Sequence, residues 1–400
     1  MSGMSNFIHY NPTKIIFGKE TIQKNLKDEV PKGSKVMMIY GGGSIKKNGT
    51  YDKVMTALDG YEVTEFGGVK PNPSYELAMK AVKVIKDKGI DFLLAVGGGS
   101  VLDSTKFIAL AAVYEAGDPW NMTKMNKSEE EEPTKVVPFG AILTLPATGS
   151  EANMWTVVNK NETNEKRFVG SPLIFPKFSI LDPETTYSLP WRQTRNGIVD
   201  TFIHIIEYYV NDDDNTSVPD RFAESLITIL MESAVALKKN PNDYVARANF
   251  FWASTQGNNG SLGYGIKRQD WGLHWIAHEI TAISNADHAL TLACVVKGYW
   301  THQKERKASK LKMMAEKVYG VTEGTDEEKV QACIDKTVEW LHSVDMPTNM
   351  SECNITKEDY IKIGKKIDDF YIKECGMKGI GSYGDITGKE TIEILNFCDF

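Results

Sequence analysis

The sequence predicts an α/β protein in which a mostly parallel sheet domain comes first and an all-helical domain follows. Over the first 190 residues, short apolar runs alternate with segments of helical periodicity, the pattern expected when strands and helices alternate along a parallel sheet. From about Trp191 this alternation gives way to long helical patterns. Because 400 residues are too many for one hydrophobic core, we expect two domains, residues 1–190 and residues 191–400.

The expected strands are continuous apolar runs, and amphipathic patterns lie between them. Strands are predicted at residues 14–17, 35–40, 61–66 and 91–96, and helices at 51–58, 76–88 and 101–114. In the second of these helices, Ala78, Ala81, Val82 and Ile85 fall on one face. A Rossmann-like sheet of this kind binds ligands beyond the carboxyl ends of its strands.

Helical periodicity dominates the second half of the chain. Helices are predicted at residues 196–210, 220–239 and 243–256, with further helical segments up to Lys373. Pro183 and Pro190 mark the expected boundary between the domains. The acidic run at residues 211–215 lacks the spacing and the closing glutamate of a calcium loop, so we interpret it as a surface turn.

Composition excludes several classes of partner. The net charge of −7 and the pI of about 5.7 argue against nucleic acid or an anionic membrane, because both would require a basic face. The five cysteines are scattered without paired spacing, which indicates free thiols in a reducing compartment. We see no signal peptide at the N-terminus and no apolar run near ~18 residues, so we expect a cytoplasmic protein without a membrane span.

A glycine-rich turn joins the predicted strand at 91–96 to the following helix. It consists of Gly97, Gly98, Gly99 and Ser100. Glycines allow close backbone approach and the helix N-terminus offers free N–H groups, which together suit a pyrophosphate. Asp103 and Lys106 lie one turn further on. We group Asp103 with this site, and Lys106 either adds positive charge to it or is an ordinary solvated or ion-paired lysine.

A second turn follows the strand at 35–40 and bears on which dinucleotide binds. It contains Gly42, Gly43, Ser44, Lys46 and Lys47, and no acidic residue. Folds that bind NAD usually place an acid near the ribose 2′-hydroxyl, whereas a hydroxyl and two ammonium groups favour a 2′-phosphate. The turn therefore predicts NADP(H), with a plain solvent-exposed turn as the alternative.

Four of the seven histidines fall between residues 196 and 288. Asp200 and His204 are four residues apart, and His274 and His278 repeat that spacing, so each pair projects from one face of a helix. His288 closes the stretch. A carboxylate with imidazoles suits one divalent metal, Fe²⁺ or Zn²⁺. The helical domain is therefore predicted to bind metal, but spacing alone does not choose between His274 and His278 as a ligand.

These motifs together resemble the iron-containing (group III) alcohol dehydrogenases over nearly the whole chain, and most of all their NADPH-dependent butanol dehydrogenase and aldehyde reductase branch. Beyond the first glycine turn and the histidine set, residues 144–151 (Thr-Leu-Pro-Ala-Thr-Gly-Ser-Glu) and 181–183 (Leu-Asp-Pro) also match. Ala147 stands where the family usually has glycine, and Asp287 where many members have proline. Neither departure removes a predicted ligand.

The resemblance implies a role for each of these residues. The metal ligands would be Asp200, His204, His274 and His288. His278 would not be a ligand but would face the nicotinamide and the substrate. Because an unperturbed imidazole titrates near neutrality, our own hypothesis is that His278 is the catalytic residue of the proton path. The cofactor would contact Asn72, Thr144, Asn153 and Lys166, with Gly42 and Ser44 at the adenosine ribose phosphate. By sequence position, Trp155 and Trp275 are candidates for an apolar substrate pocket.

We expect a metal-dependent NADP(H) alcohol dehydrogenase that acts chiefly as a reductase of short- to medium-chain aldehydes such as butanal. The metal would polarise the carbonyl and NADPH would donate hydride. A homodimer is expected, partly by analogy with the family and partly because the strand near residues 10–17 could pair across a two-fold axis. The alternatives are a glycerol-dehydrogenase-like polyol oxidoreductase and a non-catalytic sensor of metal and nucleotide. A cyclising lyase of the same fold would need extra basic residues near the metal, and we see none in the sequence.

Overall fold

The computed structural model of the protein describes residues 4–211 and 216–400, which form two compact units. The sheet unit comprises Tyr10–Thr194 and Asn240–Thr255. The helical unit comprises the described residues of Met1–His9, Arg195–Lys239 and Gln256–Phe400. The units therefore meet in sequence at Thr194 and Arg195, close to the predicted boundary, while residues 240–255 belong to the sheet unit. As a statement about domains, the division after residue 190 stays a prediction.

The sheet unit is built on a parallel sheet, as the alternating pattern predicts. Within the described residues this sheet has six strands in the order β1-β8-β5-β4-β2-β3, and all neighbours pair in parallel. The strands are β1 (Lys14–Phe17), β2 (Lys35–Tyr40), β3 (Glu62–Phe66), β4 (Phe92–Gly98), β5 (Phe139–Leu145) and β8 (Phe178–Leu181). Because β4 and β2 are neighbours, the two glycine-rich turns that follow them lie at the same edge of the sheet.

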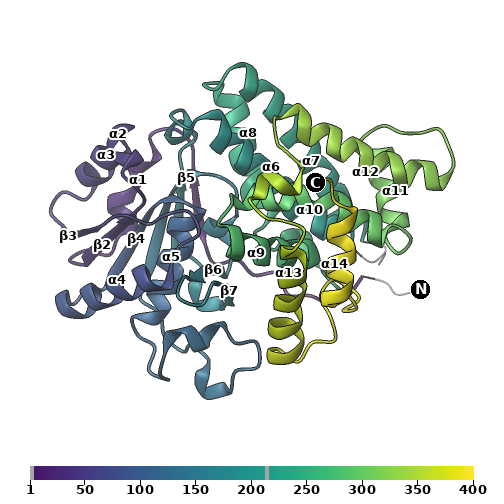
Figure 1. Ribbon diagram of the computed structural model, residues 1–400. Helices are drawn as coiled ribbons and strands as arrows, with labels where there is room; N and C mark the ends of the chain where they lie inside the picture. The colour runs from purple at the N-terminus through teal and green to yellow at the C-terminus, as the bar shows by residue number, and fades with distance from the viewer. Residues whose placement is uncertain (1–3, 212–215) are drawn as a thin grey trace. The chain divides into compact units, whose positions relative to one another are not determined.

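Helices cover both faces of this sheet (Figure 1). The helices of the unit are α1 (Thr21–Glu29), α2 (Ser44–Lys47), α3 (Thr50–Ala57), α4 (Tyr75–Lys88) and α5 (Gly99–Ala111). In β2, Met37 and Ile39 join the core formed with α4 and α5, whereas Val36 and Met38 join the core formed with α1 and α3. Burial on both faces explains why the strand is a continuous apolar run.

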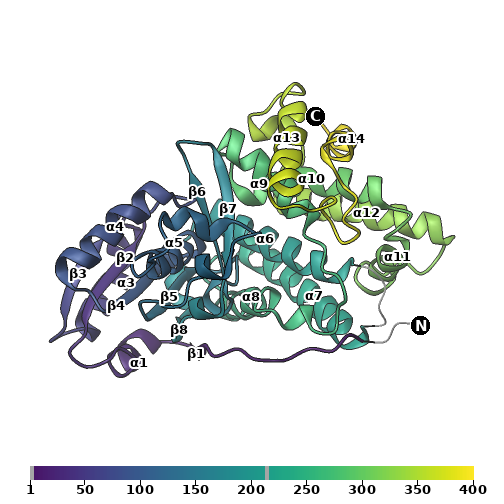
Figure 2. The ribbon, with the colours of Figure 1, turned by 90° about the horizontal axis from the view of Figure 1, so that it is seen from below.

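A separate antiparallel hairpin is formed by β6 (Trp155–Lys160) and β7 (Glu165–Gly170), which Figure 2 shows side by side. This hairpin was not predicted, and neither were β5 and β8. Trp155 pairs with Gly170, where an added Cβ would lie 2.1 Å from the Trp155 ring. Short 3₁₀ helices connect the strands: η1 (Pro119–Thr123), η2 (Glu129–Glu131), η3 (Ser150–Ala152), η4 (Pro172–Ile174) and η5 (Pro183–Thr186).

The helical unit consists of helices among the described residues, as predicted. They are α6 (Trp191–Tyr209), α7 (Ser217–Lys239), η6 (Ser261–Gly263), α9 (Gly272–Ser284), α10 (His288–Gln303), α11 (Ala308–Lys317), α12 (Asp326–Ser343), η7 (Met350–Cys353), α13 (Asp359–Ile367), the π-helix η8 (Asp368–Glu374) and α14 (Gly388–Phe397). The first turn of α6 and most of α8 (Tyr244–Gly257) belong to the sheet unit. Four residues of the acidic run predicted as a surface turn, 212–215, lie outside the described residues.

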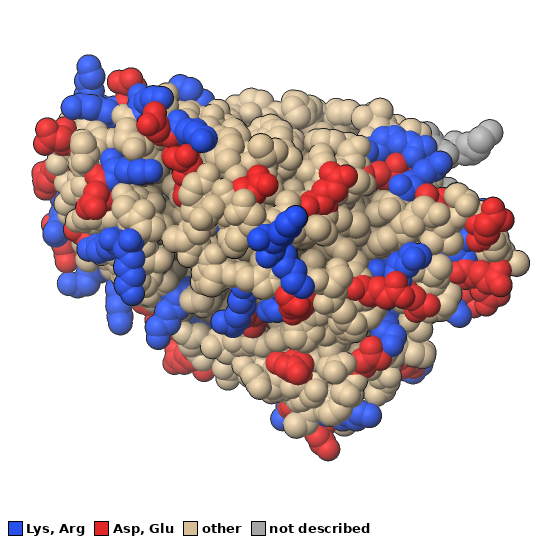
Figure 3. Space-filling model, turned by 90° about the horizontal axis from the view of Figure 1, so that it is seen from above, with Lys and Arg blue, Asp and Glu red and all other residues tan. Residues whose placement is uncertain are grey.

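Basic and acidic side chains are interspersed on the face drawn in Figure 3. In the parts of the chain that the structure describes, no helix has both the length and the apolar character needed to cross a bilayer. No cysteine among these residues forms a disulfide.

Candidate metal centre and cofactor loops

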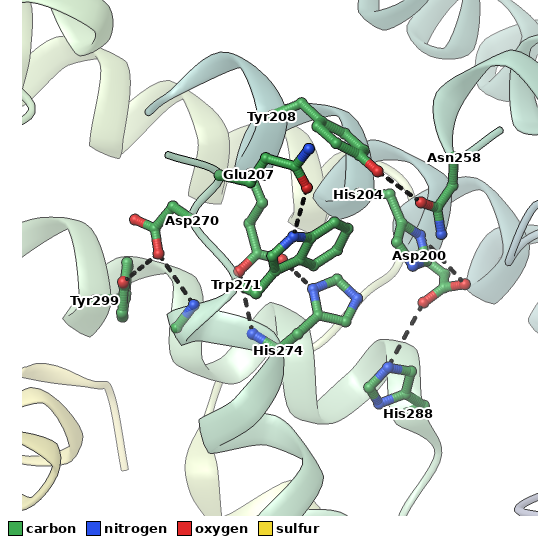
Figure 4. Close-up of polar contacts among 12 residues, drawn as sticks. Asp200, His204, Glu207, Tyr208, Asn258, Asp270, Trp271, His274, His288 and Tyr299 are labelled. Carbon is green, nitrogen blue, oxygen red and sulfur yellow. Dashed lines mark hydrogen bonds and ion pairs between the residues drawn. The ribbon is translucent and has the colours of Figure 1, made fainter. Parts of the chain in front are cut away.

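Three helices of the helical unit bring the predicted metal ligands together (Figure 4). Asp200 and His204 lie one turn apart on α6, His274 lies in the first turn of α9, and His288 is the first residue of α10. Asp200 and His274 are each 4 % exposed and His204 is 6 % exposed. The helical spacing predicted for Asp200 and His204 is therefore confirmed, and their shared face points into the unit.

The ligand atoms of these side chains converge on one small volume. Asp200, His204 and His274 each offer one atom within 4.8 Å of the other two. Asp200 Oδ2 lies 3.7 Å from His204 Nδ1, and Asp200 Oδ1 lies 3.9 Å from His288 Nε2. The His274 ring centroid is 4.6 Å from that of His204 and 5.4 Å from that of His288. Asp200, His204 and His274 thus form a cluster that could hold a metal ion, and His288 approaches it through Asp200.

The donor set fits a divalent cation. Among the described residues, Asp200 Oδ1 and His204 Nδ1 are buried and take part in no hydrogen bond. Leaving such atoms unsatisfied costs free energy, which a bound cation would offset. Burial lowers the pKa of His204, which favours the neutral imidazole that a metal requires. One carboxylate with three imidazoles suits iron or zinc.

His278 also reaches this group of side chains. It lies one turn after His274 on α9, is buried, and its ring centroid is 5.2 Å from that of His288 and 6.2 Å from that of His274. The mutual distances of the ligand atoms place Asp200, His204 and His274 in one cluster, and neither His278 nor His288 belongs to it, although His288 Nε2 lies 3.9 Å from Asp200 Oδ1. Its role in catalysis stays a prediction.

The first glycine turn lies where β4 ends and α5 begins. An added Cβ would lie 2.5 Å from the Val101 side chain at Gly97 and 2.6 Å from the Thr148 side chain at Gly99. These glycines therefore permit close packing of the turn against α5 and against the loop after β5, in addition to any approach by a phosphate. The first N–H groups of α5 are the donors predicted for the pyrophosphate.

Lys106 is not a solvated lysine, so that interpretation is wrong. Its ammonium group is completely buried and donates to the carbonyl oxygens of Asn153 and Trp155 and to Asn153 Oδ1, each at 2.9 Å. Asp103 accepts from Ser150 Oγ at 2.7 Å and from the backbone N–H of Val157 at 3.1 Å. Both residues tie α5 to the loop after β5 and to the start of β6, and the predicted cofactor contact of Asp103 stays a prediction.

Two other predicted cofactor residues touch each other. Lys166 Nζ donates to Asn72 Oδ1 at 3.2 Å, so β7 and the turn before α4 are joined at this point. Asn72 has a φ of 55°, in the left-handed region that asparagine tolerates better than most residues. Thr144, at the end of β5, and Asn153 are both buried.

Comparison with known proteins agrees with this arrangement. Residues 12–183 match the family described as iron-containing alcohol dehydrogenase, and residues 194–369 match the C-terminal part of the Fe-containing alcohol dehydrogenase family. The chain belongs to the iron-containing alcohol dehydrogenases. The predicted family and the predicted fold class are thereby confirmed.

Relatives of this iron-containing alcohol dehydrogenase match along almost their whole length. The NADPH-dependent aldehyde reductase YqhD of Escherichia coli is 43 % identical, over 96 % of this chain and 97 % of its own. A probable NADH-dependent butanol dehydrogenase 1 of Bacillus subtilis is 40 % identical, over 98 % of this chain and 99 % of its own. The crystal structure of E. coli YqhD superposes with a TM-score of 0.94 at 41 % identity and covers 99 % of both chains.

Glu207 is a site residue that sequence reasoning missed in this alcohol dehydrogenase. Its carboxylate contacts His274 Nδ1 and accepts a hydrogen bond from the backbone N–H of His274 at 3.2 Å. Burial, followed by the nearby charge of Asp270, raises the pKa of Glu207 well above its ordinary value. The signal that could have identified it is its position on α6, where Glu207 continues the helical spacing of Asp200 and His204.

Trp271 is the aromatic residue beside the cluster. Its ring centroid lies 5.4 Å from that of His274 and 6.2 Å from that of His204. Trp275, which was predicted as a pocket candidate, instead stacks on Tyr371 at 5.0 Å. Trp155 is 43 % exposed and belongs to the hairpin of the sheet unit.

In the second glycine turn, the positive charge of Lys46 is offset by the carboxylate of Glu65. Lys46 Nζ lies 2.8 Å from Glu65 Oε2, and Glu65 also accepts hydrogen bonds from Tyr40 Oη at 2.9 Å and Tyr51 Oη at 2.6 Å. The hydrogen bond from Lys46 is the main reason that the pKa of Glu65 falls to about 2. Glu65 lies on β3, the neighbouring strand, so a search confined to the turn could not find this acid.

Proposed function

We propose that this protein is a metal-dependent NADP(H) alcohol dehydrogenase that acts chiefly as a reductase of short- to medium-chain aldehydes such as butanal. The observation that carries the proposal is the convergence of Asp200, His204, His274 and His288 on one volume. Family membership and relatives described as an aldehyde reductase and as butanol dehydrogenases support it.

The four converging side chains would hold one Fe²⁺ or Zn²⁺. When bound, the cation would supply a Lewis acid for the carbonyl oxygen, and NADPH would supply the hydride. The protein's own contribution is to fix these side chains before substrate arrives. Asp200 and His204 are fixed by one rigid helix, and His274 is held by Glu207.

His278 would move the proton that completes reduction. It is buried, lies one turn from His274 and has its ring 5.2 Å from that of His288. An imidazole titrates near neutrality in its unperturbed state, which suits a group that donates and then recovers a proton. We assign His278 this role in preference to a fifth ligand.

The cofactor is proposed to be NADP(H). Gly42, Gly43 and Ser44 follow β2, the neighbour of the strand that precedes the pyrophosphate turn, so they are suited to the adenosine ribose. Ser44 and Lys47 are exposed on the short helix α2. Lys46 forms an ion pair with Glu65, so Glu65 already offsets part of the positive charge that Lys46 would offer to a 2′-phosphate.

The assembly is proposed to be a cytoplasmic homodimer. In the described sheet, β1 is an edge strand, and Phe7, Ile8 and Tyr10 in the segment before it are 51 %, 88 % and 69 % exposed. An open strand edge and exposed apolar side chains are features that a second copy of the chain could cover. The mass of the protein in solution tests whether it is a dimer. The proposed cytoplasmic location rests on the scattered cysteines, which indicate free thiols in a reducing compartment.

Oxidation of NADPH by butanal, followed at the absorbance of NADPH, tests the proposed function. We expect metal-loaded protein to turn over with butanal and NADPH at a higher kcat/KM than with NADH or with glycerol and NADP⁺. Preference for glycerol would favour the polyol oxidoreductase. Binding of NADPH without turnover of any aldehyde or alcohol would favour the sensor and would contradict the proposal.

A further inference from the structure

We propose that Glu207 is the positioning residue of the metal centre, where it fixes the imidazole of His274 so that Nε2 is presented to the cation. The inference rests on the proposed metal site, because it concerns how one of the ligands is held. It adds a residue that is not itself expected to touch the metal, the cofactor or the substrate.

Glu207 lies on the same stripe of α6 as two of the ligands. Asp200, His204 and Glu207 occupy positions i, i+4 and i+7, which fall on one face of an α-helix. The side chains of Glu207 and His274 are only 5 % and 6 % exposed. One helix therefore provides two ligands and, one turn further along, the carboxylate that meets a third ligand from another helix.

The contact with His274 has two points. One carboxylate oxygen accepts the backbone N–H of His274 at 3.2 Å, and the other meets its ring Nδ1. His274 is the third residue of α9, and the N–H groups of a helix's first turn have no partner within the helix. Glu207 therefore fixes both the backbone position of His274 and the rotation of its ring.

This contact selects the tautomer of His274. We take the carboxylate as the acceptor at the ring, as it is for the backbone N–H of His274, so that the ring nitrogen facing it carries the proton. With Nδ1 protonated, the lone pair of the neutral ring is on Nε2, which is then the atom that can bind a metal.

Asp270 and Lys307 support the start of α9 beside this contact. Asp270 Oδ1 accepts from the backbone N–H of Gly272 at 3.0 Å and from Tyr299 Oη at 2.7 Å. Lys307 forms a buried ion pair with Asp270 and donates to the carbonyl oxygen of Val210 at 2.8 Å. The first turn of α9 is thus held at Gly272 by Asp270 and at His274 by Glu207. Loss of Glu207 should therefore disturb His274 while Asp270 still holds the start of the helix.

The test compares metal binding by Glu207→Gln and Glu207→Ala with that of the wild type, using Zn²⁺ titration and the visible spectrum of bound Co²⁺. We expect Glu207→Ala to bind Zn²⁺ roughly 10- to 100-fold more weakly, the range typical for loss of such a partner, with an altered Co²⁺ spectrum. Glu207→Gln keeps the size and one acceptor oxygen, so its loss should be smaller and should partly restore the spectrum.

Glu224→Gln is the matched control. Glu224 is another buried glutamate that packs against α6, where it accepts a hydrogen bond from Tyr209 Oη at 3.0 Å. This variant should lower the stability of the metal-free protein without changing Zn²⁺ affinity. If Glu207→Ala and Glu207→Gln bind Zn²⁺ as tightly as Glu224→Gln and the wild type, Glu207 has only a structural role and the inference is wrong.

These outcomes separate the inference from the proposed function. A wild-type protein that binds neither Zn²⁺ nor Co²⁺ would contradict the metal site itself, whatever the variants do. A wild type that binds metal beside variants that bind equally well would contradict the inference alone. If Glu207→Ala fails to fold, the nearly isosteric Glu207→Gln still decides, because an unchanged affinity and spectrum would overturn the assignment.

Discussion

Two histidines one turn apart on α9 have different surroundings, and the difference bears on what each can do. His274 is bonded to a buried carboxylate and lies within the cluster of ligand atoms, whereas His278 lies at its margin, nearer to His288. A fixed ring is suited to metal binding and a ring beside the cluster to proton transfer. This physical distinction supports the choice that helical spacing left open.

His278→Ala should separate these roles. We expect metal content to stay at the wild-type level while kcat for butanal reduction falls by roughly 10²- to 10⁴-fold, the usual contribution of a general acid or base. Metal analysis and the pH profile of kcat on the same preparation measure both effects. Turnover that matches the wild type at every pH would exclude the proton role, and a loss of metal would make His278 a ligand.

Residues within one helical turn of each other were predictable, and residues joined only by the fold were not. Asp200 and His204, or His274 and His278, can be paired from their spacing because one helix fixes their relation. Glu207 contacts His274, which is 67 positions away in the sequence. Glu65 lies on β3 and contacts Lys46 on the helix α2. No local pattern encodes such contacts. Because Glu65 was not part of the pattern around the second glycine turn, the positive charge predicted for this turn was too large.

At the scale of elements, α5 and the loop after β5 form one connected group through a buried lysine. Lys106 donates three hydrogen bonds into this loop, and two of its acceptors belong to Asn153, a predicted cofactor contact. Burial lowers the pKa of Lys106 to about 7, against an ordinary value of 10.5. Cofactor binding is therefore expected to depend on Lys106 through the position of Asn153.

Lys106 should also give the protein a measurable pH dependence. Between about pH 7 and pH 10 the unfolded chain holds the proton of Lys106 that the folded protein releases, so stability rises with pH in this window. Each pKa unit corresponds to about 1.4 kcal/mol, which makes the rise a few kcal/mol at most. In urea unfolding, Lys106→Met should lack this part of the rise.

Lys83→Met, at an exposed position on α4, is the control for removing a lysine. Its unfolding free energy should follow that of the wild type across the same pH range. Parallel curves for the wild type and Lys106→Met would mean that Lys106 does not change its protonation in this window, and the predicted pH dependence would then be wrong.

The elements that could be predicted are those buried either on both faces or along one clear face. The strands at 35–40 and 91–96 are apolar on both faces, and the helices at 76–88 and 220–239 have one clear apolar face, so their positions were found to within a few residues. The hairpin of β6 and β7 is different. Its sequences, WTVVNK and EKRFVG, mix polar and apolar residues, and antiparallel pairing with each other defines them more than burial does.

For the whole molecule, length and composition predicted two structural parts but not how the chain is divided between them. Most of α8 (Tyr244–Gly257) belongs to the sheet unit, although its helical pattern resembles those of the helical unit. Periodicity reports that a segment is helical and which face is apolar, and it does not report which core that face joins. Membership in the iron-containing alcohol dehydrogenases was predictable because several modest motifs occur in one order.

The metal content of the purified wild type and of Asp200→Ala, His204→Ala, His274→Ala and His288→Ala tests the central claim most directly. We predict close to one Fe²⁺ or Zn²⁺ per wild-type chain and a large loss of metal in each variant, because every one of these side chains faces the same volume. Variants that retain as much metal as the wild type, or a metal-free wild type that still reduces butanal with NADPH, would contradict it.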